Sequence, residues 1–105
     1  MYHLIVYTPI ADAQKIRDVL ARMGAGKIGN YDFCSFSVRG TGRFRPLRGA
    51  EPHIGLVGSV EEVEEESIEV VVPDGTDIHA LVRELRAAHP YEEPAIHILP
   101  MADLG

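Results

Sequence analysis

The sequence predicts an α+β domain in which a four-stranded antiparallel sheet carries two helices on one face. Three observations lead to this fold class. Short apolar or alternating segments predict four strands, and two segments with a period near 3.6 residues predict helices. Their order along the chain is β-α-β-β-α-β, which is that of the ferredoxin-like split β-α-β fold. No linker or low-complexity segment interrupts residues 1–105, so we expect a single domain.

The first half of the chain predicts a strand, a helix and a second strand. Tyr2 to Tyr7 is a short apolar and aromatic run typical of a buried strand, and Thr8-Pro9 ends it and opens the helix. The helix carries one apolar stripe, made of Ile16, Val19, Leu20 and Met23. Gly24 and Gly26 are expected to stop it. The period of two from Asp32 to Val38 predicts a half-buried strand, with Cys34 as a small core residue.

The second half predicts an excursion, a strand, a helix and a last strand. Gly40 to Gly58 is rich in glycine and proline and predicts a long loop or ribbon between strands two and three. Val60 to Val72 predicts the third strand. Thr76 or Asp77 is expected to cap a helix that stops before Pro90, with an apolar stripe made of Ile78, Leu81, Val82 and Leu85. Ala95 to Leu99 predicts the fourth strand.

The charges are concentrated in two segments of the chain. There are 16 acidic and 10 basic side chains, which gives a formal net charge of −6 and argues against non-specific nucleic-acid binding. Acidic residues gather in residues 61–69, and four arginines lie in residues 39–48. We interpret the two segments as the paired arms of an antiparallel ribbon with opposite charges facing each other. An anion-binding arginine patch and a simple solvated surface are the alternatives.

Cysteine content and hydropathy limit the class of protein further. Cys34 is the only cysteine, which excludes an intrachain disulfide and a cysteine-rich zinc module. No apolar stretch approaches the roughly 18–20 residues that span a membrane, and no secretory signal pattern is present. We therefore expect a cytoplasmic protein with no membrane partner.

Four stretches carry a family resemblance: Gly24 to Gly55, Val60 to Pro73, Ile78 to Ala88, and His89 to Pro100. Together they resemble the small domain inserted in the NGG-interacting-factor-like proteins (the Nif family, YqfO type), which is similar in fold to the trimeric CutA and PII signalling proteins. The resemblance places the dinuclear metal centre of the full-length relatives outside the matched stretch. It therefore implies no catalytic residue in this chain, and we do not expect an enzyme.

Two glycine-rich turns are candidate ligand sites. Asn30 and Tyr31 follow Gly29, and Thr41 lies between Gly40 and Gly42, so both turns could present backbone N–H groups to an anion. The basic and polar side chains that could assist are Arg43, Arg45, His53 and Tyr91. The alternative is that both turns serve chain reversal alone.

The segment His89-Pro90-Tyr91-Glu92-Glu93-Pro94 is a candidate metal site. One imidazole and two carboxylates, from His89, Glu92 and Glu93, suit a divalent metal ion such as zinc or copper, which would be the cofactor. The alternative is structural: Pro90 stops the helix, His89 donates to its last carbonyls, and Pro94 begins an edge strand.

The expected partner is a second copy of the chain. Helices cover only one face of the predicted sheet, and the other face would expose apolar side chains, from Ile5 or Leu4, Phe33, Val71, and Ile96 or Leu99. Self-association would cover that face, and the CutA and PII resemblance favours a homotrimer. We expect a non-catalytic binding or regulatory module for a small ligand. The alternatives are a divalent metal-binding protein and, after that, an enzyme acting at a subunit interface.

Overall fold

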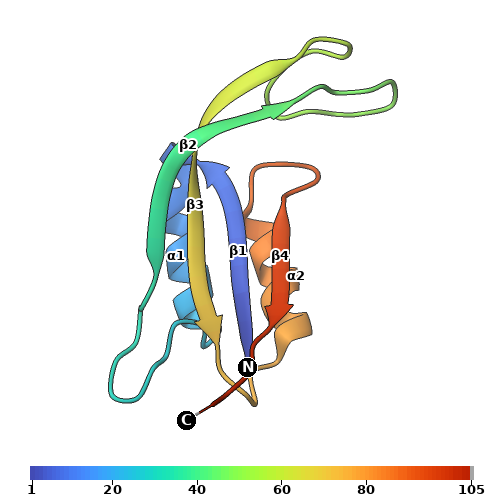
Figure 1. The fold of residues 1–105 in the computed structure, drawn as a ribbon. Coiled ribbons are helices and arrows are strands. Elements are labelled where there is room, and N and C mark those ends of the chain that lie inside the picture. Colours follow the sequence, from blue (N-terminus) through green and yellow to red (C-terminus); the bar gives the residue numbers. More distant parts are fainter. Residues whose placement is uncertain (105) are drawn as a thin grey trace.

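A computed structural model describes residues 1–104, so the last residue of the expected domain, Gly105, lies outside the described residues. The four strands are β1 (Tyr2–Pro9), β2 (Phe36–Phe44), β3 (Glu61–Val72) and β4 (Ile96–Pro100). The helices are α1 (Ala13–Arg22), preceded by the short 3-10 helix η1 (Ile10–Asp12), and α2 (Ile78–Ala88). The sheet order is β2-β3-β1-β4 and every neighbouring pair is antiparallel, with both helices on one face (Figure 1). The predicted ferredoxin-like order is confirmed.

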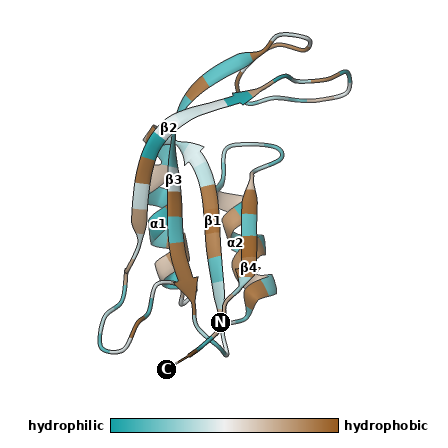
Figure 2. Cartoon of the chain, viewed as in Figure 1, coloured by the Kyte–Doolittle hydropathy of each residue, from teal (hydrophilic) through white to brown (hydrophobic). Residues whose placement is uncertain are grey.

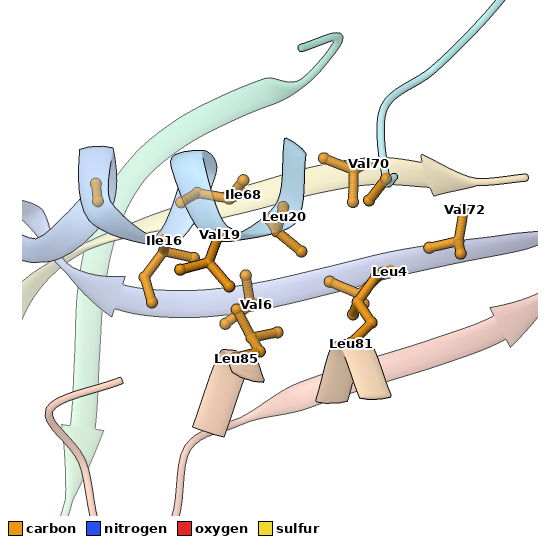
Figure 3. Close-up of a cluster of buried hydrophobic side chains, with 12 residues drawn as sticks. Leu4, Val6, Ile16, Val19, Leu20, Ile68, Val70, Val72, Leu81 and Leu85 are labelled. Carbon is orange, nitrogen blue, oxygen red and sulfur yellow. The ribbon is translucent and has the colours of Figure 1, made fainter. Parts of the chain in front are cut away.

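The core lies between the two helices and one face of β1 and β3 (Figure 3). Alternate residues of each strand point into it because successive strand side chains face opposite sides. The fully buried side chains that fill it include Leu4, Val6, Ile16, Leu20, Ile68, Val72, Leu81 and Leu85. Burying one such side chain stabilises the fold by roughly 1.5–3 kcal/mol, so this layer supplies most of the stability.

In the part of the chain that the structure describes, no helix is long and apolar enough to cross a membrane.

The ends of α2 are fixed by local hydrogen bonds. Of the two predicted capping residues, Thr76 and Asp77, the N-cap is Asp77, whose carboxylate accepts the Ala80 N–H at 3.0 Å. At the other end, the His89 N–H donates to the Leu85 carbonyl at 3.0 Å, and Pro90 follows. The chain therefore leaves α2 at a defined position and enters the loop of residues 89–95, which reaches β4.

Strands β2 and β3 continue past the end of the sheet as a two-stranded ribbon. The last residue of β1, Pro9, lies opposite Glu65, whereas the β2–β3 pairing runs on to Phe44 opposite Glu61. We call residues 41–64 the arm; it bends over the end of the sheet beside the loop of residues 89–95 (Figure 1). The radius of gyration is 14.7 Å, against about 13 Å for a compact domain of this size, because the arm projects. The predicted excursion is confirmed, although its first residues belong to β2.

Opposite charges face each other across the arm, as predicted. Arg43 lies opposite Glu62, and its Nε donates to the Glu62 Oε1 at 3.1 Å. The neighbouring uncharged residue Thr41 also bonds across the arm, since its hydroxyl donates to the Glu64 Oε1 at 3.3 Å. At the foot of the ribbon the pairing changes: Glu66 is buried and accepts from Arg17 of α1 at 2.6 Å.

The predicted start of the second strand and the predicted burial of Cys34 are wrong. β2 begins at Phe36, and the Cys34 N–H donates to the Gly26 carbonyl at 3.0 Å rather than to β3. Phe33 has a positive φ of 56°, which breaks the alternation there. Cys34 is half-buried, because it lies in the loop before β2 and not in the sheet.

The sheet face opposite the helices is open. Ile5 and Val71 point to it and are half-buried, and Leu99 is exposed, whereas Leu4 lies in the core and Ile96 packs against the core. The alternation of hydrophobic and hydrophilic residues along β3 and β4 is visible in Figure 2. Phe33 was also expected on this face, but it lies in the loop before β2. Exposed apolar side chains of β2, Phe36 and Val38, extend the open face to the sheet edge.

Met1 and Met101 pair at the end of the sheet that is remote from the arm. The Met101 N–H donates to the Met1 carbonyl at 3.0 Å. Figure 1 shows the N mark below β1 and the C mark below β3, with the arm at the opposite end of the sheet.

Candidate functional site

A cavity of about 720 Å³ lies beneath the arm, on the open-face side of the sheet. The arm forms one wall, the ends of β1 and β3 contribute Tyr7, Glu65 and Ser67, and the loop of residues 89–95 forms the opposite wall. Its volume is within the range of about 300–1,000 Å³ that is typical of small-molecule sites. The bend of the arm over the sheet therefore creates a concave surface of a size that suits a ligand.

Five of the seven predicted ligand-binding residues line this one cavity: Thr41, Arg43, Arg45, His53 and Tyr91. They come from three separate segments of the chain. Asn30 and Tyr31 are not brought to it, because their loop connects α1 to β2 at the opposite end of the sheet (Figure 1). There, Ile28 and Tyr31 pair their backbones across a tight turn, and both Asn30 and Tyr31 are exposed.

The predicted polar residues differ in how they are held. The guanidinium of Arg43 is paired with Glu62, and the hydroxyl of Thr41 donates to Glu64, so both help to hold the arm. Arg45 lies just past the last strand pair, and His53 lies in the loop at the arm's end; both side chains are exposed.

Tyr91 connects the loop of residues 89–95 to the arm. Its hydroxyl donates to the Glu65 Oε2 at 2.8 Å, and its ring lies 5.9 Å from the Phe44 ring, centroid to centroid. Burial and the neighbouring Glu65 carboxylate raise the pKa of Tyr91, so this phenol stays protonated and keeps donating. No sequence motif places Glu65 and Phe44 at this site, because only the register of β2 and β3 brings them to Tyr91.

His89 joins the loop of residues 89–95 to β1. Only 6 % of its surface is exposed. Its Nε2 lies 2.7 Å from the Tyr7 carbonyl oxygen, and its Nδ1 accepts the Tyr91 N–H at 3.1 Å. Burial lowers the pKa of His89, although the Tyr7 carbonyl opposes that shift. The imidazole is therefore held neutral, with both nitrogens occupied by the protein.

Comparison with known proteins identifies relatives of this chain in sequence and in fold. No protein-family model matches the sequence. A GTP cyclohydrolase 1 type 2 homolog of Halalkalibacterium halodurans is 43 % identical over the whole chain, and one from Mycobacterium tuberculosis is 45 % identical over 92 % of it. A Bacillus cereus protein related to NIF3 superposes over 97 % of the chain with a TM-score of 0.82 and 36 % identity. The chain is homologous to one segment of the NIF3-related proteins.

The segment is only part of those proteins. It spans about a quarter of their length, namely 28 % and 25 % of the two curated relatives and 26 % of the Bacillus cereus structure. CutA structures cover the whole segment at lower identity. The one from Pyrococcus horikoshii has a TM-score of 0.71 at 17 % identity, and over 87 % of its length it shows the same fold. The predicted resemblance to the Nif family and to the CutA fold is confirmed.

The predicted metal ligands of this NIF3-related segment do not form a cluster. Glu92 and Glu93 are exposed, and the Glu92 Oε2 accepts the Glu51 N–H at 3.1 Å, which ties the loop to the arm. His89 has no free nitrogen for a metal. Across residues 1–104, no group of three or more His, Cys, Asp or Glu side chains could hold a metal ion. The structural alternative expected His89 to donate to the last carbonyls of α2. Its backbone N–H does donate to the Leu85 carbonyl, but its ring contacts the Tyr7 carbonyl instead.

Proposed function

We propose that this NIF3-related segment is a non-catalytic binding module whose ligand occupies the cavity beneath the arm. The observation that carries the proposal is the convergence of Thr41, Arg43, Arg45, His53 and Tyr91 on one cavity of about 720 Å³. The paired titratable groups around it, such as Tyr91 with Glu65 and Arg43 with Glu62, hold the protein together. Such engaged groups suit recognition rather than proton transfer or nucleophilic attack.

A matched pair of tryptophan variants tests the site. Ser67 lines the cavity, so Ser67→Trp would obstruct it, whereas Ser59→Trp adds the same side chain at an exposed position that does not line the cavity. The probes are a set of small aromatic and carboxylated fragments observed by saturation-transfer NMR. We expect fragment signals with the wild-type chain and with Ser59→Trp, and their loss with Ser67→Trp. Equal signals with both variants, or none with the wild type, would reject the cavity as the site.

We also propose that the module works as a homo-oligomer, with a trimer favoured by the CutA resemblance. The exposed apolar side chains of the open face, including Phe36, Val38 and Leu99, support association with a second copy. Light scattering at micromolar concentration is the test. A trimer has a mass near 35 kDa, three times the 11.6 kDa of one chain. A stable dimer would retain the burial argument and reject three-fold symmetry, and a mass near 11.6 kDa would reject association.

Divalent-cation binding is the alternative function. A structural neighbour from Thermus thermophilus, at 23 % identity, carries the name divalent cation tolerance protein. The contacts of His89 and Glu92 do not favour this role, because both side chains are already hydrogen-bonded. Equilibrium dialysis against Zn²⁺ decides between the two: uptake that is lost when Glu92→Gln and Glu93→Gln are combined would establish the alternative.

A further inference from the structure

We propose that His89 is a positioning residue that sets the shape of the cavity, by holding Tyr91 against Glu65 at the point where the arm leaves the sheet. We call His89, Tyr91 and Glu65 the latch. Its importance for ligand binding rests on the proposed function, but the latch itself is a property of the fold. Three steps lead from the buried imidazole to the arm.

The first step fixes the state of the imidazole. The backbone N–H of Tyr91 can only donate, so the Nδ1 of His89, 3.1 Å away, must accept. The neutral ring then carries its proton on Nε2, which donates to the Tyr7 carbonyl at 2.7 Å. Tyr7 belongs to β1, so a single buried side chain joins the sheet to the loop of residues 89–95.

The second step places the Tyr91 side chain. The loop leaves His89 through Pro90, whose fixed φ restricts the backbone between the two residues. With its N–H held by His89, Tyr91 directs its ring towards the arm, 5.1 Å from the His89 ring and 5.9 Å from the Phe44 ring. Its hydroxyl then reaches Glu65 at 2.8 Å.

The third step connects the latch to the arm. Glu65 is the first residue of β3 that lies opposite β1, and on its other side it lies opposite Gly40 of β2. Fixing its side chain therefore fixes the base of the arm. Gly42 supports this reading, because a Cβ at Gly42 would collide with the Glu65 carboxylate. The absence of a side chain at position 42 leaves the room that the carboxylate occupies.

A purely structural role at the end of α2 would not require this arrangement. The backbone N–H of His89 already closes the helix on Leu85, without help from the ring. The ring's two hydrogen bonds go instead to β1 and to the loop, and each needs a different nitrogen. This separation allows the two bonds to be removed one at a time.

Two substitutions separate them. His89→Asn can place an acceptor oxygen where Nδ1 lies, but it is too short to reach the Tyr7 carbonyl. His89→Gln can reach that carbonyl with its N–H₂ group but leaves no acceptor for the Tyr91 N–H. The readouts on the full chain are the NOE between the Tyr91 and Phe44 rings and amide hydrogen exchange of residues 41–44 and 61–64.

We expect His89→Asn to retain the NOE and to change exchange in the arm less than His89→Gln does, because it keeps the acceptor for the Tyr91 N–H and loses only the bond to Tyr7. His89→Gln should lose the NOE, and the arm amides should exchange about 5–10-fold faster, as the loss of one net hydrogen bond predicts. Exchange in β1 and the core half of β3 should stay unchanged in both variants. Wild-type behaviour of His89→Gln, or equal loss in both variants, would overturn the positioning role.

Tyr91→Phe keeps the test decisive if both His89 variants unfold. It removes only the hydroxyl that donates to Glu65 and leaves the His89 contacts in place. We expect faster exchange in the arm with an unchanged core, and unchanged exchange in the arm would overturn the latch. Since no ligand is added, failure of the latch and failure of the binding proposal are observed separately.

Discussion

The body of the molecule and its arm are held together by different interactions. In the body, two helices and one sheet face enclose fully buried side chains such as Leu20 and Leu81. In the arm, the chain is held by strand pairing, exposed ion pairs such as Arg43 with Glu62, and the contacts of Tyr91 at its base. Large apolar residues near its end, such as Leu47 and Leu56, stay exposed. The free energy of folding therefore comes mainly from the body.

The largest expected effect comes from placing a charge in the body. Leu20 is 1 % exposed, so Leu20→Asp would bury a carboxylate without a partner and should abolish cooperative unfolding. The same change at the exposed Leu47 of the arm should alter the free energy of unfolding by no more than about 0.5 kcal/mol. Urea denaturation measures both. A stable, cooperative Leu20→Asp variant would mean that the assigned core face is wrong.

A smaller effect is expected at the base of the arm. Gly42→Ala would push a methyl group into the Glu65 carboxylate, which would have to leave Tyr91 to make room, and the loss of that one hydrogen bond should cost about 0.5–1.5 kcal/mol. Gly40→Ala is the matched control, because no heavy atom lies within 4 Å of its added Cβ. Thermal unfolding of the two variants should differ. Equal stabilities would indicate that Glu65 moves aside freely.

The pH dependence of stability should report on the buried imidazole that joins the two regions. Burial lowers the pKa of His89 in the folded chain, so the unfolded chain binds more protons as the pH falls through the usual histidine range. The stability contribution is complete above the unfolded pKa of about 6.5 and is lost as the pH falls toward the lower, folded pKa. The charged groups that act on the ring are Asp12 of η1 and Glu65 of β3, which oppose the shift, and Lys15 of α1, which assists it.

Denaturation between pH 5 and pH 8 measures this dependence. His89→Asn should flatten the profile, whereas His79→Asn should leave it unchanged, because His79 is exposed on α2. A profile that persists in His89→Asn would assign the proton uptake to other groups.

The smallest effect is expected for the ion pairs of the arm. Arg43 and Glu62 are both more than 60 % exposed, so Arg43→Glu should cost about 0.2–1 kcal/mol, and less at high salt. Arg45→Glu lies beyond the last strand pair and serves as the control. Urea denaturation at two salt concentrations measures the difference. An effect of Arg43→Glu that does not depend on salt would contradict a role for charge pairing.

The same contrast explains which parts could be predicted from the sequence. The helices were predictable because their signals are local: Leu81 and Leu85 repeat at helical spacing, and Asp77 precedes them as a cap. The charged ribbon was predictable because a basic segment, residues 39–48, and an acidic segment, residues 61–69, lie close to each other along the chain and have opposite charges. The start of β2 was not, because it depends on a contact between Cys34 and Gly26, and no local pattern encodes that contact.

The candidate site shows the same limit more strongly. Tyr91, Thr41 and the arginines could be proposed from their chemistry, but their convergence on one cavity depends on how the arm bends. Glu65 is one of six similar acids in residues 61–69, and only its register opposite Pro9 and Gly40 distinguishes it. The metal site was proposed because one imidazole and two carboxylates lie close together in residues 89–94, whereas the structure uses both nitrogens of His89 for hydrogen bonds.

The meeting of the chain ends, where Met101 bonds to Met1, has a consequence for how such a domain can be joined to others. If a host chain were joined to both ends of this domain, its two attachment points would lie close together. Inserting a domain into a host chain costs loop-closure entropy, because the two attachment points in the host must be held together. This cost is small when the two ends of the inserted domain are adjacent. The cavity and the arm lie at the far end, so such a host would attach without covering them (Figure 1).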